Sequence, residues 1–212
     1  MKKIKAVVFD LGRVLIDFDH NIAAKKILKH TGKTQQEIYD FFFDSPLTAL
    51  FEEGKISGVD FFKEVKKKLG LRLSYKEFLP IWNDIFIFTG QNQRIYALAK
   101  KLKKKYKVSL LSNINALHFA YLKNKFPVFD VFDNLFLSYQ IKAKKPDPAL
   151  YRSVIRRLGV EPEEIFYTDD RQDLIEASRK LKIRGFVFKN PGQLRKDLEK
   201  AGIFLKTLDK KR

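Results

Sequence analysis

The sequence contains no cysteine and only three histidines (His20, His30 and His118) among its 212 residues. Without cysteine the chain can form no disulfide framework, no thiolate zinc site and no cysteine nucleophile, and we expect a cytoplasmic protein. The histidines do not have the spacing of a histidine metal-binding motif. A metal in this protein is therefore expected to be a hard cation held by carboxylate oxygens.

Long apolar runs are also absent. The apolar run that follows the first lysines ends at Asp10 without a small-residue cleavage site, so no secretory signal is expected. No stretch approaches the roughly 20 apolar residues that a membrane helix needs, and we predict no membrane partner. Hydrophobic residues make up 45% of the chain and charged residues 32%, which is typical of a folded, soluble protein.

Acidic residues are few: 25 Asp and Glu stand against 43 Lys and Arg, and the net charge is +18. A charge of this size is compatible with a nucleic-acid partner or with the steering of anionic substrates. The lysines recur in many predicted helices and do not form one stripe with aromatic residues between them. This distribution favours a basic solvated surface, and nucleic-acid binding stays open as a minority hypothesis. The oligomeric state cannot be read from the sequence.

Five short apolar runs rich in β-branched residues predict the strands of a parallel sheet that is buried on both faces. They lie at 4–9, 107–111, 135–137, 165–168 and 183–188. Amphipathic segments long enough for helices lie between or after them, at 92–105, 116–125, 148–158, 174–181 and 192–201. The alternation of strands and helices predicts an α/β fold with a doubly wound parallel sheet.

Residues 17–89 interrupt this alternation. They show helical periodicity and no convincing strand, and they carry three capping signals, namely Thr34 with Glu37, Ser57 with Asp60 and Ser74 with Glu77. Phenylalanines at helical spacing are expected to pack between these helices. We predict an all-helical cap domain at 17–89, inserted after the first strand of a catalytic core domain at 1–16 and 90–212.

Polar side chains gather where the predicted strands end. Ligands of an open parallel sheet bind outside the carboxyl ends of its strands, so these positions are the ones to inspect. They carry carboxylates, hydroxyl and amide donors and, in a nearby loop, a lysine; the residues are Asp10, Ser112, Asn113, Asp169, Asp170 and Lys145. A single aspartate after a strand is most often a helix cap, and Asp147, between two prolines, is predicted to be one. Together the groups at this edge are the equipment for phosphoryl transfer.

Four segments of the chain, in order, are VVFDLGRVLIDFD, LLSN, KKPDPALY and FYTDD. With this order and spacing the sequence resembles the haloacid dehalogenase superfamily, and within it the subgroup similar to α-D-glucose-1-phosphate phosphatase. The resemblance spans residues 7 to 178, with the insert where the superfamily has its helical cap. It implies a Rossmann-like catalytic core with a cap.

The resemblance also implies a role for each matching residue. Asp10 is expected to attack phosphorus and form an aspartyl-phosphate that water then hydrolyses. The metal is expected to be Mg²⁺, held by the carboxylates of Asp10 and Asp170 and by the backbone carbonyl of Gly12. The remaining roles are phosphate binding for Ser112 and Asn113, charge neutralisation at the phosphate and nucleophile for Lys145, and a position around the metal ligands for Asp169.

The sequence departs from the superfamily pattern at two positions. Gly12 stands where most of these phosphatases have an aspartate that serves as general acid and base. Leu174 stands where the superfamily has an asparagine, and Asp173, one position earlier, is a possible replacement. We do not transfer the missing acid role to Asp17 or Asp19, because either aspartate could equally cap the first helix of the insert.

These observations predict a Mg²⁺-dependent phosphomonoester hydrolase that acts on a small phosphorylated metabolite, with a sugar phosphate among the candidates. One alternative is a 2-haloacid dehalogenase on the same fold, in which Asp10 attacks carbon. That reaction needs no metal, so the pair Asp169 and Asp170 argues against it. Another alternative is a catalytically weak relative that binds a phosphorylated ligand or nucleic acid, with Gly12, Leu174 and the high charge as its marks.

Overall fold

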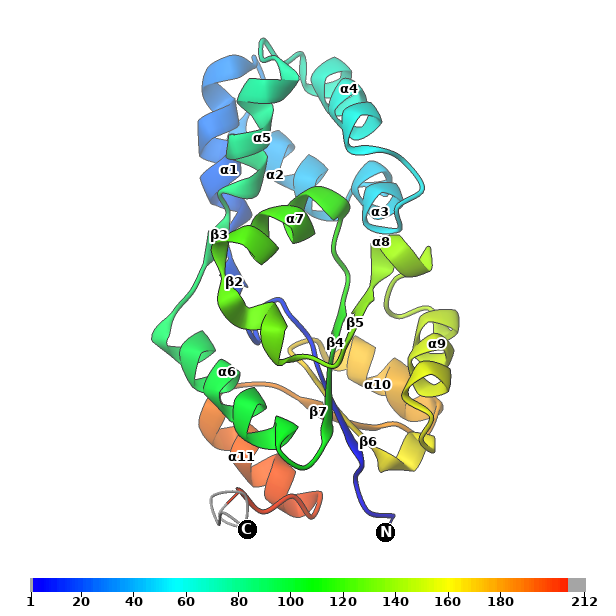
Figure 1. Ribbon diagram of the computed structural model, residues 1–212. Helices are drawn as coiled ribbons and strands as arrows, with labels where there is room; N and C mark the ends of the chain where they lie inside the picture. Colours follow the sequence, from blue (N-terminus) through cyan, green and yellow to red (C-terminus); the bar gives the residue numbers. More distant parts are fainter. Residues whose placement is uncertain (1, 206–212) are drawn as a thin grey trace.

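The computed structural model describes residues 2–205, and for Phe43 and Asp44 it describes the backbone only. Its centre is a five-stranded parallel sheet in the order β5-β4-β1-β6-β7 (Figure 1). The strands are β1 (Ala6–Phe9), β4 (Lys107–Ser112), β5 (Asn134–Leu137), β6 (Ile165–Asp169) and β7 (Arg184–Val187). All five predicted strands are present, and the predicted α/β fold with a parallel sheet is confirmed.

Helices cover both faces of this sheet. Side chains of β1 alternate between the faces, as the two-residue period of a strand requires. Val7 and Phe9 pack with residues of α6 (Gly90–Lys103), α7 (Ala116–Lys125) and α11 (Pro191–Lys200). Ala6 and Val8 pack with residues of α9 (Pro148–Leu158) and α10 (Gln172–Lys180). The fully buried strands explain why the sequence shows continuous apolar runs in place of an alternating pattern.

The predicted helices of the core lie within two residues of their predicted bounds. Helix α9 shows why: Pro148 occupies its first turn, Asp147 accepts a hydrogen bond from the Ala149 N–H at 2.8 Å, and Gly159 ends it with φ of 64°. The predicted cap at Asp147 is thereby confirmed. Shorter elements complete the core, namely η2 (Pro127–Val131), α8 (Ser138–Ile141) and η3 (Pro162–Glu164).

The segment between β1 and α6 folds into helices with a hydrophobic core of their own, above the sheet in Figure 1. The helices are α1 (His20–Ile27), η1 (Leu28–His30), α2 (Gln35–Asp44), α3 (Pro46–Glu52), α4 (Gly58–Leu69) and α5 (Tyr75–Asn83). Trp82 lies at the centre of this core. Its ring centroid is 5.0 Å from that of Phe42, 4.8 Å from that of Phe61 and 5.8 Å from that of Phe78. All three predicted capping signals form N-caps, for α2, α4 and α5.

The expectation of no strand in this segment is wrong at its two ends. Strands β2 (Asp17–Phe18) and β3 (Phe86–Ile87) form an antiparallel pair, with Phe18 opposite Phe86. A two-residue strand is too short to produce a periodic pattern, which is why the sequence did not indicate it. The two aspartates that were considered as helix caps, Asp17 and Asp19, have different roles in the structure. Asp17 belongs to β2, whereas Asp19 caps α1 by accepting a hydrogen bond from Asn21 at 2.9 Å.

No helix within residues 2–205 combines the length and the apolar composition that crossing a membrane requires. This agrees with the absence of long apolar runs in the sequence.

Candidate active site

The predicted site residues meet at the carboxyl edge of the sheet. Asp10 follows β1, Ser112 ends β4 and Asp169 ends β6. Because β1 lies between the other two strands, the backbone N–H of Asp10 donates to the carbonyl of Thr168 at 2.9 Å and aligns the two strand ends. The loop between α8 and α9 adds Lys145 to the same place. The topology therefore brings together side chains that lie more than 100 residues apart in sequence.

Lys145 is the centre of this arrangement. Its ammonium group lies 2.5 Å from Oδ1 of Asp10, 2.7 Å from Oδ2 of Asp169 and 3.3 Å from the carbonyl oxygen of Leu111. An ammonium group has three donors, and these three acceptors use all of them. The side chain is only 3% exposed, so the ion pairs are shielded from solvent. Burial acts to lower the pKa of Lys145, but the two carboxylates outweigh it and the pKa is raised, so the lysine stays charged.

Asp169 is fully buried and accepts several hydrogen bonds. Besides Lys145, the hydroxyl of Tyr167 and the backbone N–H of Arg171 donate to it, the latter at 3.0 Å. Burial acts to raise the pKa of Asp169, yet the charge of Lys145 and these donors lower it, so the carboxylate stays ionised. The sequence reading missed Tyr167. Its position two residues before Asp169 places both side chains on the same side of β6, which is the signal that could have found it.

Three carboxylates form a group that fits a metal ion. One oxygen each of Asp10, Asp169 and Asp170 lies within 4.8 Å of the others, and residues 2–205 contain no other such group. Burial, with the neighbouring negative charge of Asp169, raises the pKa of Asp10 to about 7 although Lys145 opposes the shift. The same two causes raise the pKa of Asp170 to about 6. Three carboxylates share one ammonium group, so a divalent cation with a preference for oxygen ligands would offset the remaining charge.

The two candidate phosphate-binding residues differ in their contacts. Ser112 is 3% exposed, and its hydroxyl donates weakly, at 3.4 Å, to the carbonyl of Asn113. The amide of Asn113 holds the backbone of Lys145, donating to its carbonyl at 3.0 Å and accepting from its N–H at 2.8 Å. Asn113 therefore anchors the loop that carries Lys145.

Asp173, the possible replacement for the superfamily's asparagine, lies outside the group of Asp10, Asp169 and Asp170. Its carboxylate pairs with the guanidinium of Arg171 at 2.6 Å, and both side chains are more than half exposed. The structure instead buries Leu174, whose carbonyl accepts a hydrogen bond from Tyr151 at 3.0 Å. One residue of displacement turns a helical side chain by about 100°, which explains why Asp173 faces away.

Gly12 lies in a tight turn directly after the nucleophile candidate. The turn continues through Arg13, which has the left-handed φ of 59° and donates its N–H to the carbonyl of Ile16 at 2.9 Å. A β-carbon built on Gly12 would lie 3.8 Å from Oδ2 of Asp10. The position expected to carry an acid is therefore next to Asp10, and it carries no side chain.

Two polar contacts of the helical segment, one half-buried and one buried, were not indicated by the sequence. Glu52, at the end of α3, lies 3.2 Å from Lys144, and burial raises the pKa of this glutamate. His118, in the first turn of α7, interacts through Nε2 with the carbonyl oxygen of Trp82 at 3.1 Å. Burial lowers the pKa of His118 to about 3, so it is neutral at ordinary pH.

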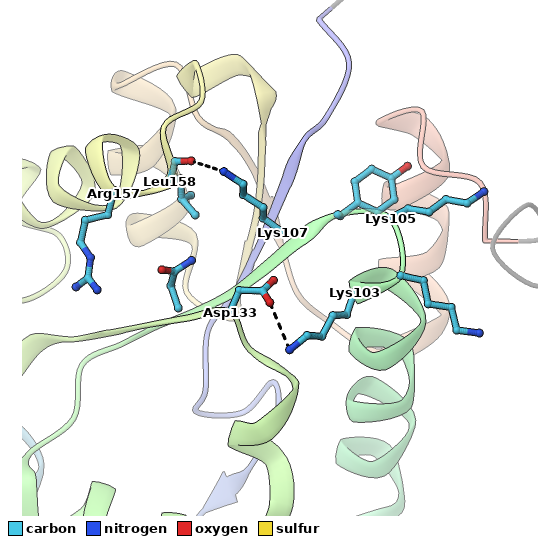
Figure 2. Close-up of a pocket in the computed structure, with 9 residues that line it drawn as sticks. Lys103, Lys105, Lys107, Asp133, Arg157 and Leu158 are labelled. Carbon is cyan, nitrogen blue, oxygen red and sulfur yellow. Dashed lines mark hydrogen bonds and ion pairs between the residues drawn. The ribbon is translucent and has the colours of Figure 1, made fainter.

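A hollow of about 630 Å³ lies at the opposite edge of the sheet, where β4 and β5 begin (Figure 2). Basic side chains dominate its wall. Lys103 pairs with Asp133 at 3.3 Å, and Lys107 donates to the carbonyl of Leu158 at 3.0 Å. None of the predicted site residues lines this hollow, so it is separate from the candidate active site.

The comparison with protein families agrees with the geometry. Residues 7–188 match the model of the family described as haloacid dehalogenase-like hydrolase. The chain belongs to this family. The predicted superfamily is therefore confirmed, whereas the predicted subgroup similar to α-D-glucose-1-phosphate phosphatase finds no support among the relatives reported below.

Two curated relatives of this chain are named phosphatases. It is 29% identical over 201 residues to a D-ribitol-5-phosphate phosphatase of Bacteroides thetaiotaomicron, covering 92% of this chain and 97% of that protein. It is also 29% identical over 212 residues to a phosphatase of Mycobacterium tuberculosis, covering 95% and 97%. These similarities support the prediction of a phosphatase of the haloacid dehalogenase type.

Solved structures of similar proteins support Mg²⁺ as the cofactor. A haloacid dehalogenase family enzyme of Bacteroides thetaiotaomicron, in complex with magnesium and inorganic phosphate, superposes with a TM-score of 0.78 at 30% identity, covering 88% of this chain and 94% of that chain. An L-2-haloacid dehalogenase gives a TM-score of 0.64 at 19% identity and shares the fold. The relative with magnesium supports the predicted cofactor of this family member.

Proposed function

We propose that this chain is a Mg²⁺-dependent phosphomonoester hydrolase that acts on a small phosphorylated metabolite, with Asp10 as the nucleophile. The observation that carries the proposal is the buried contact of Lys145 with both Asp10 and Asp169, with Asp170 in the same carboxylate group. A D-ribitol-5-phosphate phosphatase among the relatives supports a sugar or sugar-alcohol phosphate as the substrate.

In the first step an oxygen of Asp10 attacks phosphorus and the ester oxygen leaves. Nucleophile and substrate are both anionic, and two like charges about 4 Å apart cost roughly 4 kcal/mol at an effective dielectric constant near 20. Lys145 offsets this repulsion, since its charge lies 2.5 Å from Oδ1 of Asp10. Asn113 keeps Lys145 in place through two backbone hydrogen bonds, and Ser112 at the end of β4 is the proposed donor to the phosphoryl oxygens.

In the second step water hydrolyses the aspartyl-phosphate and restores the Asp10 carboxylate. We assign the metal ligands to the carboxylates of Asp10 and Asp170 and to the backbone carbonyl of Gly12, and Asp169 to the support of the neighbouring Lys145. A bound Mg²⁺ supplies charge stabilisation of the phosphoryl group without taking part in proton transfer. The all-oxygen donor set and the excess of carboxylates over ammonium groups fit such a cation.

We also propose that the chain forms two domains, a catalytic core at 1–16 and 90–212, with an apolar cluster on each face of its sheet, and a helical cap at 17–89. Within the described residues, up to 205, the helices of the cap enclose their own apolar cluster. A 2-haloacid dehalogenase is the less favoured function, because its reaction needs no metal, whereas Asp169 and Asp170 add two carboxylates beside Asp10 that fit a metal site.

The test is a phosphatase screen over a panel of phosphorylated metabolites, with Mg²⁺ and with a chelator. We expect phosphate release that requires Mg²⁺ and that falls by at least about 10⁴-fold in Asp10→Asn, as expected for loss of a nucleophile. Chloride release from a 2-haloacid without Mg²⁺ would support the dehalogenase in its place.

A further inference from the structure

Resting on the proposed function, we propose that Glu52 is the general acid and base of this phosphatase and takes the role that Gly12 cannot fill. Glu52 gives a proton to the leaving oxygen of an alkyl phosphate, the class to which sugar and sugar-alcohol phosphates belong. The structural observation is that the end of α3 docks on α8 and brings the carboxylate of Glu52 to the loop that carries Lys145.

The position that was expected to carry the acid is occupied by an aromatic ring. A β-carbon built on Gly12 would lie only 2.9 Å from Cε1 of Phe18, closer than real β-carbons come to other heavy atoms. Strand β2 pairs Phe18 with Phe86, and the guanidinium of Arg13 lies 4.5 Å from the centroid of the Phe18 ring. An acid for the leaving oxygen therefore has to come from another part of the chain.

Hydrogen bonds hold the backbone of Glu52 against the catalytic core. The hydroxyl of Ser138, fully buried at the start of α8, donates to the carbonyl of Glu52 at 2.6 Å and accepts from the N–H of Ile114 at 2.9 Å. Two residues further on, Gly54 has a φ of 61° and lies so close to Tyr139 that a β-carbon would clash with its carbonyl oxygen. The end of α3 is thus fixed beside α8, as Figure 1 shows.

The side chain of Glu52 reaches the charged groups of the active site. It is 26% exposed, and its carboxylate lies 3.2 Å from Nζ of Lys144. The charges of Lys145, in the same loop, and of Arg171, after β6, also act on this carboxylate. Lys145 contacts Asp10 at 2.5 Å. Glu52 and Asp10 therefore lie within electrostatic reach of the same lysine.

The geometry of the reaction directs the leaving oxygen toward the helical segment. In an in-line displacement the leaving oxygen lies on the side of phosphorus opposite the nucleophile. Asp10 lies at the carboxyl edge of the sheet, and the helical segment that contains Glu52 lies above this edge (Figure 1). Burial raises the pKa of Glu52 although Lys144 opposes the shift, and a bound phosphate adds negative charge that acts in the same direction as burial. Both effects favour the protonated form that an acid needs.

Three other titratable groups that follow the turn at Gly12 are less suited to this role. Asp19 accepts the N-cap hydrogen bonds of α1, and Asp17 accepts from the hydroxyl of Thr89 at 3.5 Å. His20 is neutral at ordinary pH, because burial, with the nearby charge of Arg13, lowers its pKa to about 4. A neutral imidazole is a poor proton donor, so Glu52 is the better source of the proton.

The reaction balances with Glu52 as the proton source. As the bond from Asp10 to phosphorus forms, the bond from phosphorus to the leaving oxygen breaks, and that oxygen takes the electron pair and the proton of Glu52. Water then attacks phosphorus, the carboxylate of Glu52 takes a proton from it, and the bond to Asp10 breaks. The products are the alcohol and phosphate, and both carboxyl groups return to their starting states. General acid and base catalysis is commonly worth about 10² to 10⁴ in rate.

The test compares two classes of substrate with Mg²⁺ present. D-ribitol 5-phosphate and glycerol 3-phosphate have alcohol leaving groups, whereas the leaving group of 4-nitrophenyl phosphate departs as a stable anion. In Glu52→Gln we expect kcat/KM to fall by at least about 10²-fold for the alkyl phosphates and by less than about 3-fold for the aryl phosphate. An equal fall for both classes, or no fall for either, would overturn the inference and leave the proposed function intact. No turnover of any phosphate by the wild type would refute the proposed function and the inference with it.

Matched variants separate proton transfer from a structural role of Glu52. Glu53→Gln makes the same change one residue later, where the carboxylate pairs with Lys55 at 2.6 Å, and should change neither value of kcat/KM. Glu52→Asp keeps an acid on a shorter side chain and should retain more activity on the alkyl phosphates than Glu52→Gln. If Lys144→Met shows the selective loss and Glu52→Gln does not, the proton comes from Lys144 and the inference is overturned.

Discussion

The two edges of the central sheet carry similar ion pairs in different surroundings. At the carboxyl edge Lys145 contacts Asp10 at 2.5 Å, and both side chains are less than 10% exposed. At the amino edge Lys103 contacts Asp133 at 3.3 Å, with side chains 40% and 38% exposed. Solvent screens the second pair, so it contributes little, whereas the first changes the protonation of its neighbours. Burial, more than the kind of residue, separates a reactive edge from a solvated one.

The largest expected difference between the edges is produced by removing each lysine. Lys145→Met should lower kcat by about 10² to 10³-fold, the loss measured when one stabilising charge or donor is removed from other active sites. It should also lower the free energy of unfolding by about 3 to 5 kcal/mol, because two buried carboxylates lose their partner. Phosphatase kinetics and urea unfolding measure the two effects.

The matched control is Lys103→Met at the amino edge. Both substitutions replace a lysine side chain by methionine and remove one positive charge. The exposed pair of Lys103 and Asp133 contributes at most about 1 kcal/mol to the free energy of unfolding. We expect unchanged kcat/KM. A loss of activity in this variant comparable to that of Lys145→Met would break the distinction between the edges.

The next effect concerns metal binding at the carboxyl edge and its dependence on pH. The pKa of Asp10 is raised to about 7, so in the metal-free protein its protonated form stabilises the fold at low pH, and this contribution is lost as the pH rises through about 7. Mg²⁺ binds the ionised form and reverses the loss. At 100 times its Kd, Mg²⁺ should stabilise the protein by about 2.7 kcal/mol at pH 8 and by clearly less at pH 5.5.

Thermal unfolding with Mg²⁺ and with a chelator at both pH values measures this difference. Comparing the two conditions at one pH cancels the contributions of the buried His118 and the half-buried His20. Their pKa values are lowered to about 3 and about 4, and they act on stability in the opposite direction. Asp170→Asn is the control and should show a smaller stabilisation at pH 8. An equal Mg²⁺ effect at pH 5.5 and pH 8 would contradict the carboxylate assignment.

A smaller effect is expected from Tyr167→Phe, which removes one hydrogen bond to Asp169 and keeps the ring. Asp169 retains Lys145 and the N–H of Arg171 as donors, so kcat should fall by less than about 10-fold. The pH dependence of kcat should shift, because the charge of Asp169 is less well stabilised. Tyr151→Phe removes a hydroxyl that donates to the backbone carbonyl of Leu174 and not to a carboxylate, and it should leave the pH profile unchanged.

The contrast between strand ends and the helical segment also explains what the sequence could predict. The five strands and the site residues that follow them were predictable, because buried parallel strands leave continuous apolar runs and their ends are marked by polar residues. The contacts that the helical segment makes with the core could not be predicted from the sequence. Nothing local to Phe18 or Glu52 shows that the fold brings one against Gly12 and the other to Lys144. The exposed position of Asp173 was likewise decided by helix rotation, which requires an exact register.

The most direct test of the account is to detect phosphate on Asp10. The enzyme is mixed with Mg²⁺ and 4-nitrophenyl phosphate, quenched in acid during turnover and treated with borohydride, which reduces an aspartyl-phosphate to homoserine. Mass spectrometry of the peptide that contains residue 10 should find homoserine at that position, and none in Asp10→Asn or in enzyme without substrate. Steady turnover with an unmodified Asp10 at every quench time, or homoserine at another aspartate, would contradict the assignment of Asp10 as the nucleophile.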